Sequence, residues 1–272
     1  MHISPASQIP KVPQQPRSRR FKTFRVISAL ILREVESRDS RTSLGFLWAF
    51  IEPVGGIVLM SLVFSAIMRV PPLGTNFPLF YLSGMLPFGI YTEMMRKSST
   101  AVRFSRALLG FPSVTPLDAI FARFLLNYFV NIIVFVILAA LIIWMYDLKV
   151  HIDFVRACQS LLVAGALGLG FGCMNTVLFM ASSTYETVWN LLSRPLMIGS
   201  GVLILISTIP QPYQDYLWWN PVAHPVAMMH EAFYPSFQAP EVSVVYPMFL
   251  ALGAFTIGMI TLRRYIRDAM DD

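Results

Sequence analysis

Three polar side chains stand at regular spacing inside the apolar run of residues 119–145, where a cation and two amides could form ion pairs or hydrogen bonds away from water. Arg123, Asn127 and Asn131 recur every four residues, so a helix places the three side chains on one face. Hydrocarbon provides no partner for a cation or an amide, so this face must meet protein or water. Two interpretations remain open: a polar contact that holds helices together, and the lining of a wet path.

Two more charged residues stand within or beside apolar runs. Arg194 precedes Pro195 in "SRPLMIGSG" and lies either at the level of the lipid headgroups or inside the membrane. In the second position it would be an intramembrane cation able to contact an acidic lipid or sugar. Glu52, in "FIEP", either extends to cytoplasmic water or pairs with Arg41 or with a partner subunit.

Motifs for catalysis, metal binding and nucleotide binding are missing from the sequence. It contains no G-x-x-x-x-G-K-[ST] loop, no H-E-x-x-H or G-x-S-x-G motif and no Cys/His cluster. Cys158 and Cys173 fall in one apolar run without metal or disulfide spacing. No carboxylate stands at mid-membrane, where proton-coupled carriers tend to place one. We therefore predict that the chain is no enzyme, binds no metal or cofactor itself, and takes any energy from a partner.

The composition indicates the class of protein. Of the 272 residues, 56% are hydrophobic and 13% are charged, whereas a soluble domain has about a quarter charged residues. Continuous apolar runs approach the ~20 residues that cross a bilayer as a helix, and the strands of a barrel would alternate instead. We predict an all-α polytopic membrane protein with six transmembrane helices, at about 46–68, 77–95, 119–145, 154–180, 187–207 and 243–262.

The net charge of +6 indicates membrane topology rather than nucleic-acid binding. Lys and Arg cluster before residue 42, in the loop around residues 96–106 and after residue 262, which is the positive-inside pattern. Both termini are therefore predicted in the cytoplasm. Residues 1–20 are rich in Pro, Ser and Arg without an apolar core, so we expect a disordered tail and not a signal peptide.

An amphipathic segment joins the first span without a linker. In residues 21–40, apolar side chains recur at helical spacing and basic ones occupy other faces, as in an interface helix lying in the membrane surface. An ordinary basic flank of the first span would explain the same charges. The direct joint would let a displacement of the surface helix pull on the membrane domain, residues 41–272.

Two segments between the spans carry further patterns. The basic loop 96–117 is either a solvated loop or, because "RALLGF" supplies an apolar ridge, a docking helix for a cytoplasmic subunit. Residues 208–241 contain no Lys or Arg but many Trp, Tyr and Pro, so re-entrant half-helices are predicted there. His224 and His230 in this segment are expected to serve packing rather than pH sensing.

Small residues line one face of the fourth predicted span. Ala164, Gly168 and Gly172 recur every four residues, a spacing that lets two helices approach closely in a membrane. We predict a packing ridge here and assign it no chemistry.

Four stretches together resemble a known family. "LREVESRDSRTSLGFLWAFIEP", "FPLFYLSGMLPFGIYTEMMRKS", "RPL" and "YLWWNPVAHPVAMMHEAFYPSF" are similar, in order and spacing, to the permease subunit of bacterial capsular-polysaccharide ABC exporters of the ABC-2 type. The resemblance covers about residues 30–267 and leaves the N-terminal tail outside it.

The resemblance implies a homodimer in the bacterial inner membrane that binds two copies of a cytoplasmic ATPase, which would hold ATP and Mg²⁺. The cargo would be an acidic polysaccharide on a glycolipid anchor, moved from the cytoplasm to the periplasm. A periplasmic co-polymerase and an outer-membrane polysaccharide export protein would continue the path. The remaining partners are membrane lipids, with no role for nucleic acid.

The resemblance also implies three groups of site residues. The ATPase-coupling group comprises Arg33, Glu34, Arg38, Arg41, Arg103, Arg106, Leu108 and Leu109. The periplasmic mouth would be closed by Trp218, Trp219, Asn220, Pro221 and His224. Candidates for the substrate path, where weak repeated contacts suit a long polymer, are Trp48, Glu52, Tyr81, Tyr91, Arg123, Asn127, Asn131, Trp189 and Arg194. Anchoring at the membrane interface predicts the same aromatic residues.

Other functions share this composition. A permease of the same type could carry O-antigen, teichoic acid or a small drug. A multispanning enzyme acting on lipid-linked sugars should show paired carboxylates or a metal cluster at one membrane face. A channel without an ATPase fits six spans but would leave the surface helix unexplained.

Overall fold

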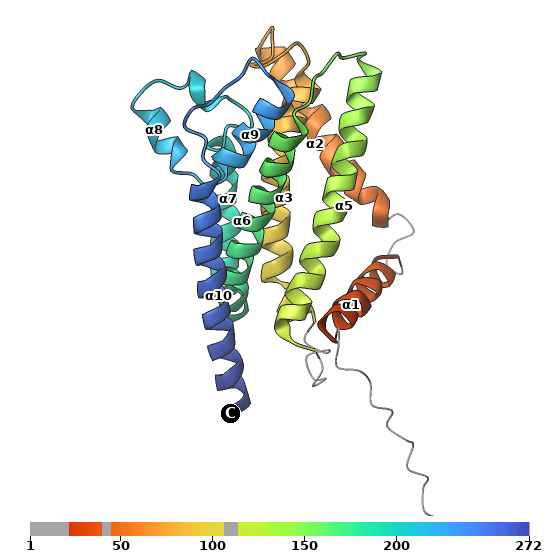
Figure 1. Cartoon of the computed structure of the whole chain (residues 1–272), viewed down its shortest axis with the longest axis vertical. Helices are drawn as coiled ribbons and strands as arrows, with labels where there is room; N and C mark the ends of the chain where they lie inside the picture. Colours follow the sequence, from red (N-terminus) through yellow and green to blue (C-terminus); the bar gives the residue numbers. More distant parts are fainter. Residues whose placement is uncertain (1–21, 40–44, 106–113, 272) are drawn as a thin grey trace, which may run out of the picture.

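The computed structural model describes residues 22–39, 45–105 and 114–271, and every regular element in these ranges is a helix (Figure 1). The elements are α1 (Lys22–Asp39), α2 (Gly45–Ile67), α3 (Phe77–Ser99), α4 (Ala101–Phe104), α5 (Pro116–Met145), α6 (Phe154–Ala181), α7 (Ser183–Ile198), the 3-10 helix η1 (Ile206–Thr208), α8 (Tyr213–Trp218), α9 (Ala223–Phe233) and α10 (Val245–Asp271). The predicted all-α fold is confirmed for the described residues.

Polar side chains set the start of three long helices. The Asn76 side chain accepts a hydrogen bond from the Leu79 N–H at the start of α3. Thr115 and Asp118 form a reciprocal capping box at the start of α5. Asp153 accepts two backbone N–H groups at the start of α6. Each cap satisfies amide groups that the helix leaves without a partner, so these three helices begin at defined residues.

Helix α6 is central, since both α3 and α10 pack along it, and α5 packs beside α3 (Figure 1). The close approach of α6 and α3 depends on glycine. A Cβ atom at Gly168 would lie 2.6 Å from the Cβ of Met94, and one at Gly172 would lie 2.5 Å from the Cβ of Ser98. The predicted packing ridge on the fourth span is confirmed by this geometry.

Four helices in the described part are long and apolar enough to cross a membrane. The segments are Phe50–Ile67, Pro116–Met145, Phe154–Ala181 and Val245–Tyr265. Helices α3 and α7 are not among them, because Pro, Tyr, Ser and Gly interrupt the apolar residues of α3 and because α7 has only 16 residues. The chain is therefore a helical multi-pass membrane protein, while the count of six spans stays a prediction.

The fifth predicted span, 187–207, differs most from the helix found there. Helix α7 begins at Ser183, where the Ser182 side chain accepts the Tyr185 N–H, and it ends at Ile198. Gly201 then adopts a φ of +83°, a left-handed conformation that glycine takes without steric cost. The chain stays apolar after this turn, so hydropathy alone places the end of the helix too late.

The two ends of the bundle carry different elements. Helix α1 packs mainly against α5, and it lies toward the same end as the C-terminal end of α10 (Figure 1). The short helices α8 and α9 lie at the opposite end, above α10 in the view of Figure 1, and α9 lies beside the first turns of α3. Below, these are called the α1 end and the α9 end.

Candidate functional site

A buried ion pair joins α1 to the membrane helices. The Glu34 carboxylate lies 3.3 Å from the Arg123 guanidinium of α5. Glu34 is 9% exposed and Arg123 is 8% exposed. An ion pair removed from water is held in one geometry, because breaking it would leave a charge buried. The pair therefore fixes where the C-terminal half of α1 rests on α5.

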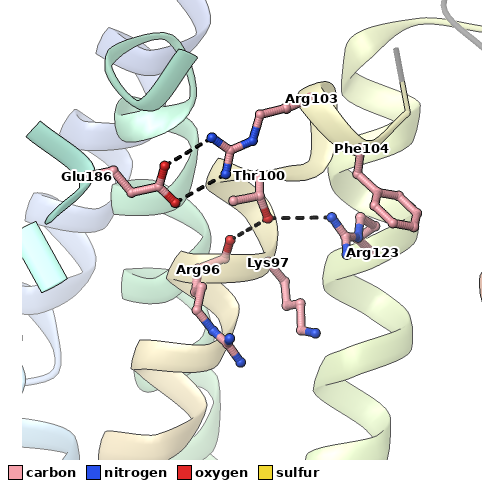
Figure 2. Close-up of a pocket in the computed structure, with 7 residues that line it drawn as sticks. All are labelled: Arg96, Lys97, Thr100, Arg103, Phe104, Arg123 and Glu186. Carbon is pink, nitrogen blue, oxygen red and sulfur yellow. Dashed lines mark hydrogen bonds and ion pairs between the residues drawn. The ribbon is translucent and has the colours of Figure 1, made fainter. Parts of the chain in front are cut away.

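The same arginine contacts α4 and the turn before it. Arg123 donates a long hydrogen bond of 3.5 Å to the Thr100 hydroxyl. Its guanidinium carbon lies 4.2 Å from the centre of the Phe104 ring, an attractive cation–π arrangement. Since Thr100 directly precedes α4 and Phe104 ends it, Arg123 links α1, α5 and α4 (Figure 2).

A second ion pair continues from α4 to α7. Arg103 donates to both carboxylate oxygens of Glu186, at 3.0 and 3.2 Å (Figure 2). Glu186 stands in the first turn of α7, where the helix dipole favours a negative charge. The fork of a guanidinium against a carboxylate fixes direction as well as distance. The contacts thus run from α1 through α5 and α4 to α7, and we call this set of side chains the α1–α7 relay.

The relay borders a basic pocket of about 430 Å³. Its walls come from α3, α4, α5 and α7 and consist of Arg96, Lys97, Thr100, Arg103, Phe104, Arg123 and Glu186 (Figure 2). Glu93, one turn before the pocket on α3, pairs with both Arg96 and Lys97. Four cations therefore surround this space at the α1 end.

The structure describes part of the predicted ATPase-coupling group. Arg33 is exposed on α1, next to the buried Glu34, and Arg103 belongs to the relay. Arg38 lies in α1, but its side chain is outside the described part. The remaining four members also lie outside the described residues: Arg41, Arg106, Leu108 and Leu109.

The predicted polar stripe of the third span divides into two kinds of contact. Arg123 reaches across to other helices, as described above. The Asn127 amide donates to the Arg123 carbonyl at 2.6 Å, and the Asn131 amide donates to the Asn127 carbonyl at 2.9 Å. Both bonds return to the backbone of α5, and they satisfy amide donors that apolar surroundings cannot. For Arg123, the interpretation as a contact between helices is the one that the geometry supports.

Of the other candidates for the substrate path, the described contacts bring only Tyr91 and Trp189 together. Tyr81 and Tyr91 are buried, at 0% and 3% exposure. Trp189 stands in a row of rings, 6.3 Å from Phe171 and 6.0 Å from Tyr185 between ring centres. Two charged candidates, Glu52 and Arg194, are exposed on α2 and α7, and the side chain of Trp48 lies outside the described part. Tyr91 and Trp189 lie on either side of one contact, since the Phe171 ring is 6.3 Å from each of them between ring centres.

At the α9 end, the predicted mouth residues form a network of their own. The Asn220 amide donates to the Ser200 hydroxyl at 2.8 Å. His224 Nδ1 accepts the backbone N–H of Ser243 at 3.2 Å, and its Nε2 lies 3.1 Å from the Trp218 carbonyl. These two partners select the neutral form with the proton on Nε2, and burial lowers the pKa of His224. Trp219 is 75% exposed, and Pro221 is half-buried just before α9.

Glu231 and His230 make further contacts at this end, and their partners were not predicted. Arg156, at the start of α6, forms an ion pair with Glu231 of α9. Glu231 also accepts the backbone N–H of Ala239 at 3.0 Å. His230 lies 3.0 Å from the Ser83 hydroxyl of α3 and stacks on Phe80 at 5.1 Å between ring centres. Helix α9 is therefore attached to both α6 and α3.

Sequence reasoning also missed three members of the relay: Thr100, Phe104 and Glu186. Thr100 and Phe104 flank a helix of only four residues, too short for a periodic pattern. Glu186 gives a usable signal, because "SSTYE" combines a serine cap with an acidic first turn. That signal predicts a helix start but does not identify its partner.

Comparison with known proteins gives a consistent family. The family model described as ABC-2 type transporter matches residues 25–234. The chain is 30% identical over 241 residues to the polysialic acid transport protein KpsM of Escherichia coli, covering 87% of this chain and 92% of KpsM. It is 26% identical to the capsule polysaccharide export inner-membrane protein CtrC of Neisseria meningitidis, covering 89% and 91%.

A third relative is the capsule polysaccharide export inner-membrane protein BexB of Haemophilus influenzae, 22% identical over 244 residues and covering 89% of this chain and 91% of BexB. The family match begins inside α1 and ends after α9, so it includes every member of the relay. On the extent of this match and on the likeness to KpsM over most of both chains, the chain belongs to the ABC-2 type transporter family.

Proposed function

We propose that this chain is the membrane permease of an ATP-driven exporter that moves an acidic, lipid-linked capsular polysaccharide across the inner membrane of a bacterium. The observation that carries the cargo is the near full-length likeness to relatives named for polysialic acid transport and capsule polysaccharide export. ATP would be hydrolysed by a separate subunit, since the sequence contains no phosphate-binding loop.

The relay supports a mechanical role for the α1 end. A cytoplasmic ATPase that pushes on α1 or on the segment after α4 would act on side chains already tied together. The Glu34–Arg123 pair passes a displacement from α1 to α5, and the Arg103–Glu186 pair passes one from α4 to α7. Helices are stiff along their axes, so such a displacement would reach the bundle without a flexible linker to absorb it.

The assembly that we propose has further parts. Two copies of the chain would form a homodimer and bind two copies of the ATPase, with Mg²⁺ and ATP on the latter. Each copy would cross the membrane six times, using α3 and α7 with the four longer spans, with both termini in the cytoplasm. Helices α8 and α9 would enter the outer face as re-entrant half-helices and close the mouth. A periplasmic co-polymerase and an outer-membrane export protein would continue the path.

The proposal is tested by purifying the tagged chain from its native membranes and identifying the chains that accompany it. We expect a nucleotide-hydrolysing subunit in a one-to-one ratio, and we expect its loss when residues 106–110 are replaced by Gly and Ser. Replacing residues 213–217 at the α9 end in the same way is the matched control, because it should leave the ATPase bound.

The cargo is tested separately in a strain that lacks the chain. Capsular polysaccharide should accumulate in the cytoplasm and return to the cell surface when the native chain is restored. Accumulation of O-antigen or teichoic acid instead would assign another cargo to the same machinery. Purification of a lone chain without any ATPase would overturn the exporter itself.

A further inference from the structure

The basic pocket at the α1 end has a ligand-like arrangement of charge. Four of its seven wall residues are cations, and the only carboxylate in the wall as described is that of Glu186. The carboxylates of Glu34 and Glu93 pair with these cations from just outside the wall, and the carboxylate of Glu52 on α2 also lies close enough to attract Arg96. The wall itself therefore carries a formal charge of +3, which the three carboxylates outside the wall balance.

The arginines of the pocket differ in how firmly they are held: Arg123 is buried, whereas Arg96 and Arg103, the rim arginines, are half exposed. Arg123 is held by Glu34, Thr100 and the Phe104 ring, and its side chain is 10% exposed. Arg96 and Arg103 have side chains that are 56% and 51% exposed. An ion pair at such exposure contributes about 1 kcal/mol or less to stability. The rim arginines can therefore turn from their present carboxylates to an incoming anion at small cost.

We propose that this pocket binds a phosphate group. The cations approach the cavity from three helices, with Arg96 and Lys97 on α3, Arg103 on α4 and Arg123 on α5 (Figure 2). A tetrahedral phosphate offers acceptor oxygens in several directions, so guanidinium and ammonium donors carried by different helices suit it. A planar carboxylate is satisfied by one guanidinium fork, as Glu186 already is by Arg103.

The position of the pocket allows two sources of the phosphate. The α1 end carries exposed arginines on α1 and α10, the pattern of a surface beside anionic headgroups. A phospholipid or glycolipid headgroup could reach the pocket from the membrane, and soluble phosphate could reach it from water. Only the assignment of this end to the cytoplasmic leaflet rests on the proposed function; the binding chemistry does not.

The test measures binding to the purified full-length chain in a maltoside detergent, without any ATPase. Native mass spectrometry compares phosphatidic acid with diacylglycerol, which differ only in the phosphate, and equilibrium dialysis measures labelled inorganic phosphate. We expect phosphatidic acid to bind and diacylglycerol not to bind. Binding of inorganic phosphate as well would show that the free anion suffices, whereas its failure to bind would make the lipid headgroup the source.

Variants locate the site. Changing both rim arginines, Arg96→Gln with Arg103→Gln, should weaken binding of phosphatidic acid at least tenfold, because two charge-assisted hydrogen bonds are lost. Arg264→Gln is the matched control, since Arg264 is an exposed arginine on α10 at the same end, outside the pocket. Arg103→Lys keeps the charge and should retain most of the binding.

Three results would overturn the proposal: equal binding of diacylglycerol, displacement of phosphatidic acid by acetate as readily as by phosphate, or unchanged binding in the double variant. Co-purification of the ATPase is measured in a separate experiment. A chain that binds its ATPase but no phosphate would therefore refute the pocket alone, and the reverse result would refute the exporter alone.

Discussion

Arg123 illustrates how a single charged residue can organise a membrane protein. Its guanidinium is 8% exposed, and it contacts a carboxylate, a hydroxyl and an aromatic ring from three other segments. Burying a charge is costly unless its partners stay in place. The cost of separating Arg123 from Glu34 therefore keeps α1 seated against the bundle.

This pairing predicts a non-additive mutational effect. Glu34→Met or Arg123→Met alone should lower the free energy of unfolding by about 3 kcal/mol, because each leaves the other charge buried. The double variant should lose less than either single variant, since no buried charge remains. Thermal unfolding in detergent, followed by circular dichroism, gives the comparison.

The Arg103–Glu186 pair is the matched control for this cycle. Its arginine is half exposed, so changing both members to Met should cost less than about 1 kcal/mol. If the losses at Glu34 and Arg123 simply add, the two residues are not energetically coupled, and the link between α1 and α5 depends on apolar packing instead.

At the scale of elements, the position of α6 depends on the absence of side chains. Gly168 and Gly172 face α3, and Gly258 of α10 faces the backbone at Cys173 of α6. Helices that approach this closely gain dispersion contacts along their length, which replace the hydrophobic effect as the driving force inside lipid. The centre of the bundle is thus held by backbone proximity rather than by large interlocking side chains.

The close approach predicts different effects for two glycines in long helices. Gly168→Ala places a methyl group 2.8 Å from the Tyr91 carbonyl oxygen, so it should destabilise the protein by about 1–3 kcal/mol through overpacking. Gly253→Ala should be neutral or stabilising by up to about 1 kcal/mol, because nothing lies within 4 Å of its Cβ position. Unfolding midpoints in detergent compare them, and equal midpoints would contradict the packing.

In the molecule as a whole, each end of the bundle has its own set of ion pairs and hydrogen bonds between helices. The α1–α7 relay lies at one end, and contacts through Asn220, His224 and Glu231 lie at the other. The long helices α3, α5, α6 and α10 run between them (Figure 1). In the proposed exporter, opening the mouth requires the second set to loosen while the first receives the movement of the ATPase.

Acidity should loosen the α9 end selectively. His224 is held neutral, because a proton on Nδ1 would remove the acceptor of the Ser243 N–H and place two donors face to face. Its pKa is lowered below the ordinary 6.5, so the loosened state binds more protons, and stability falls as the pH drops below about 6.5. Above that pH, the contribution of neutral His224 to the stability of the folded protein is fully present. His230 has a pKa lowered to about 4 by burial, so it stays neutral in the folded state at pH 5.5. It takes up a proton only when the α9 end opens, and it adds to the loss of stability in the same direction.

Tryptophan fluorescence provides the measurement, since Trp218 packs 5.5 Å from His224 between ring centres. The native chain should unfold at a lower temperature at pH 5.5 than at pH 7.5. The variant His224→Gln should show a smaller difference, because glutamine does not titrate. A difference of the same size in both proteins would place the pH dependence elsewhere.

The sequence by itself determined the class of the protein and its local features. Hydropathy and helical periodicity depend on neighbours in the chain, so the helical membrane fold, the glycine ridge and the stripe of Arg123, Asn127 and Asn131 were all predictable. The helix boundary after Ile198 was not, because apolar residues continue beyond it while Gly201 turns the chain. The order and spacing of four stretches were enough to indicate the family resemblance.

Only the tertiary structure decided which charges meet. Glu34 was predicted to contact an ATPase, and Arg123 either to hold helices together or to line a path; the pairing of these two residues with each other was not predicted. Glu186 had no predicted role until α7 was seen beside α4. The physical reason is that an ion pair between helices depends on which faces pack together, and this is set by the packing of the whole bundle rather than by the residues next to each charge.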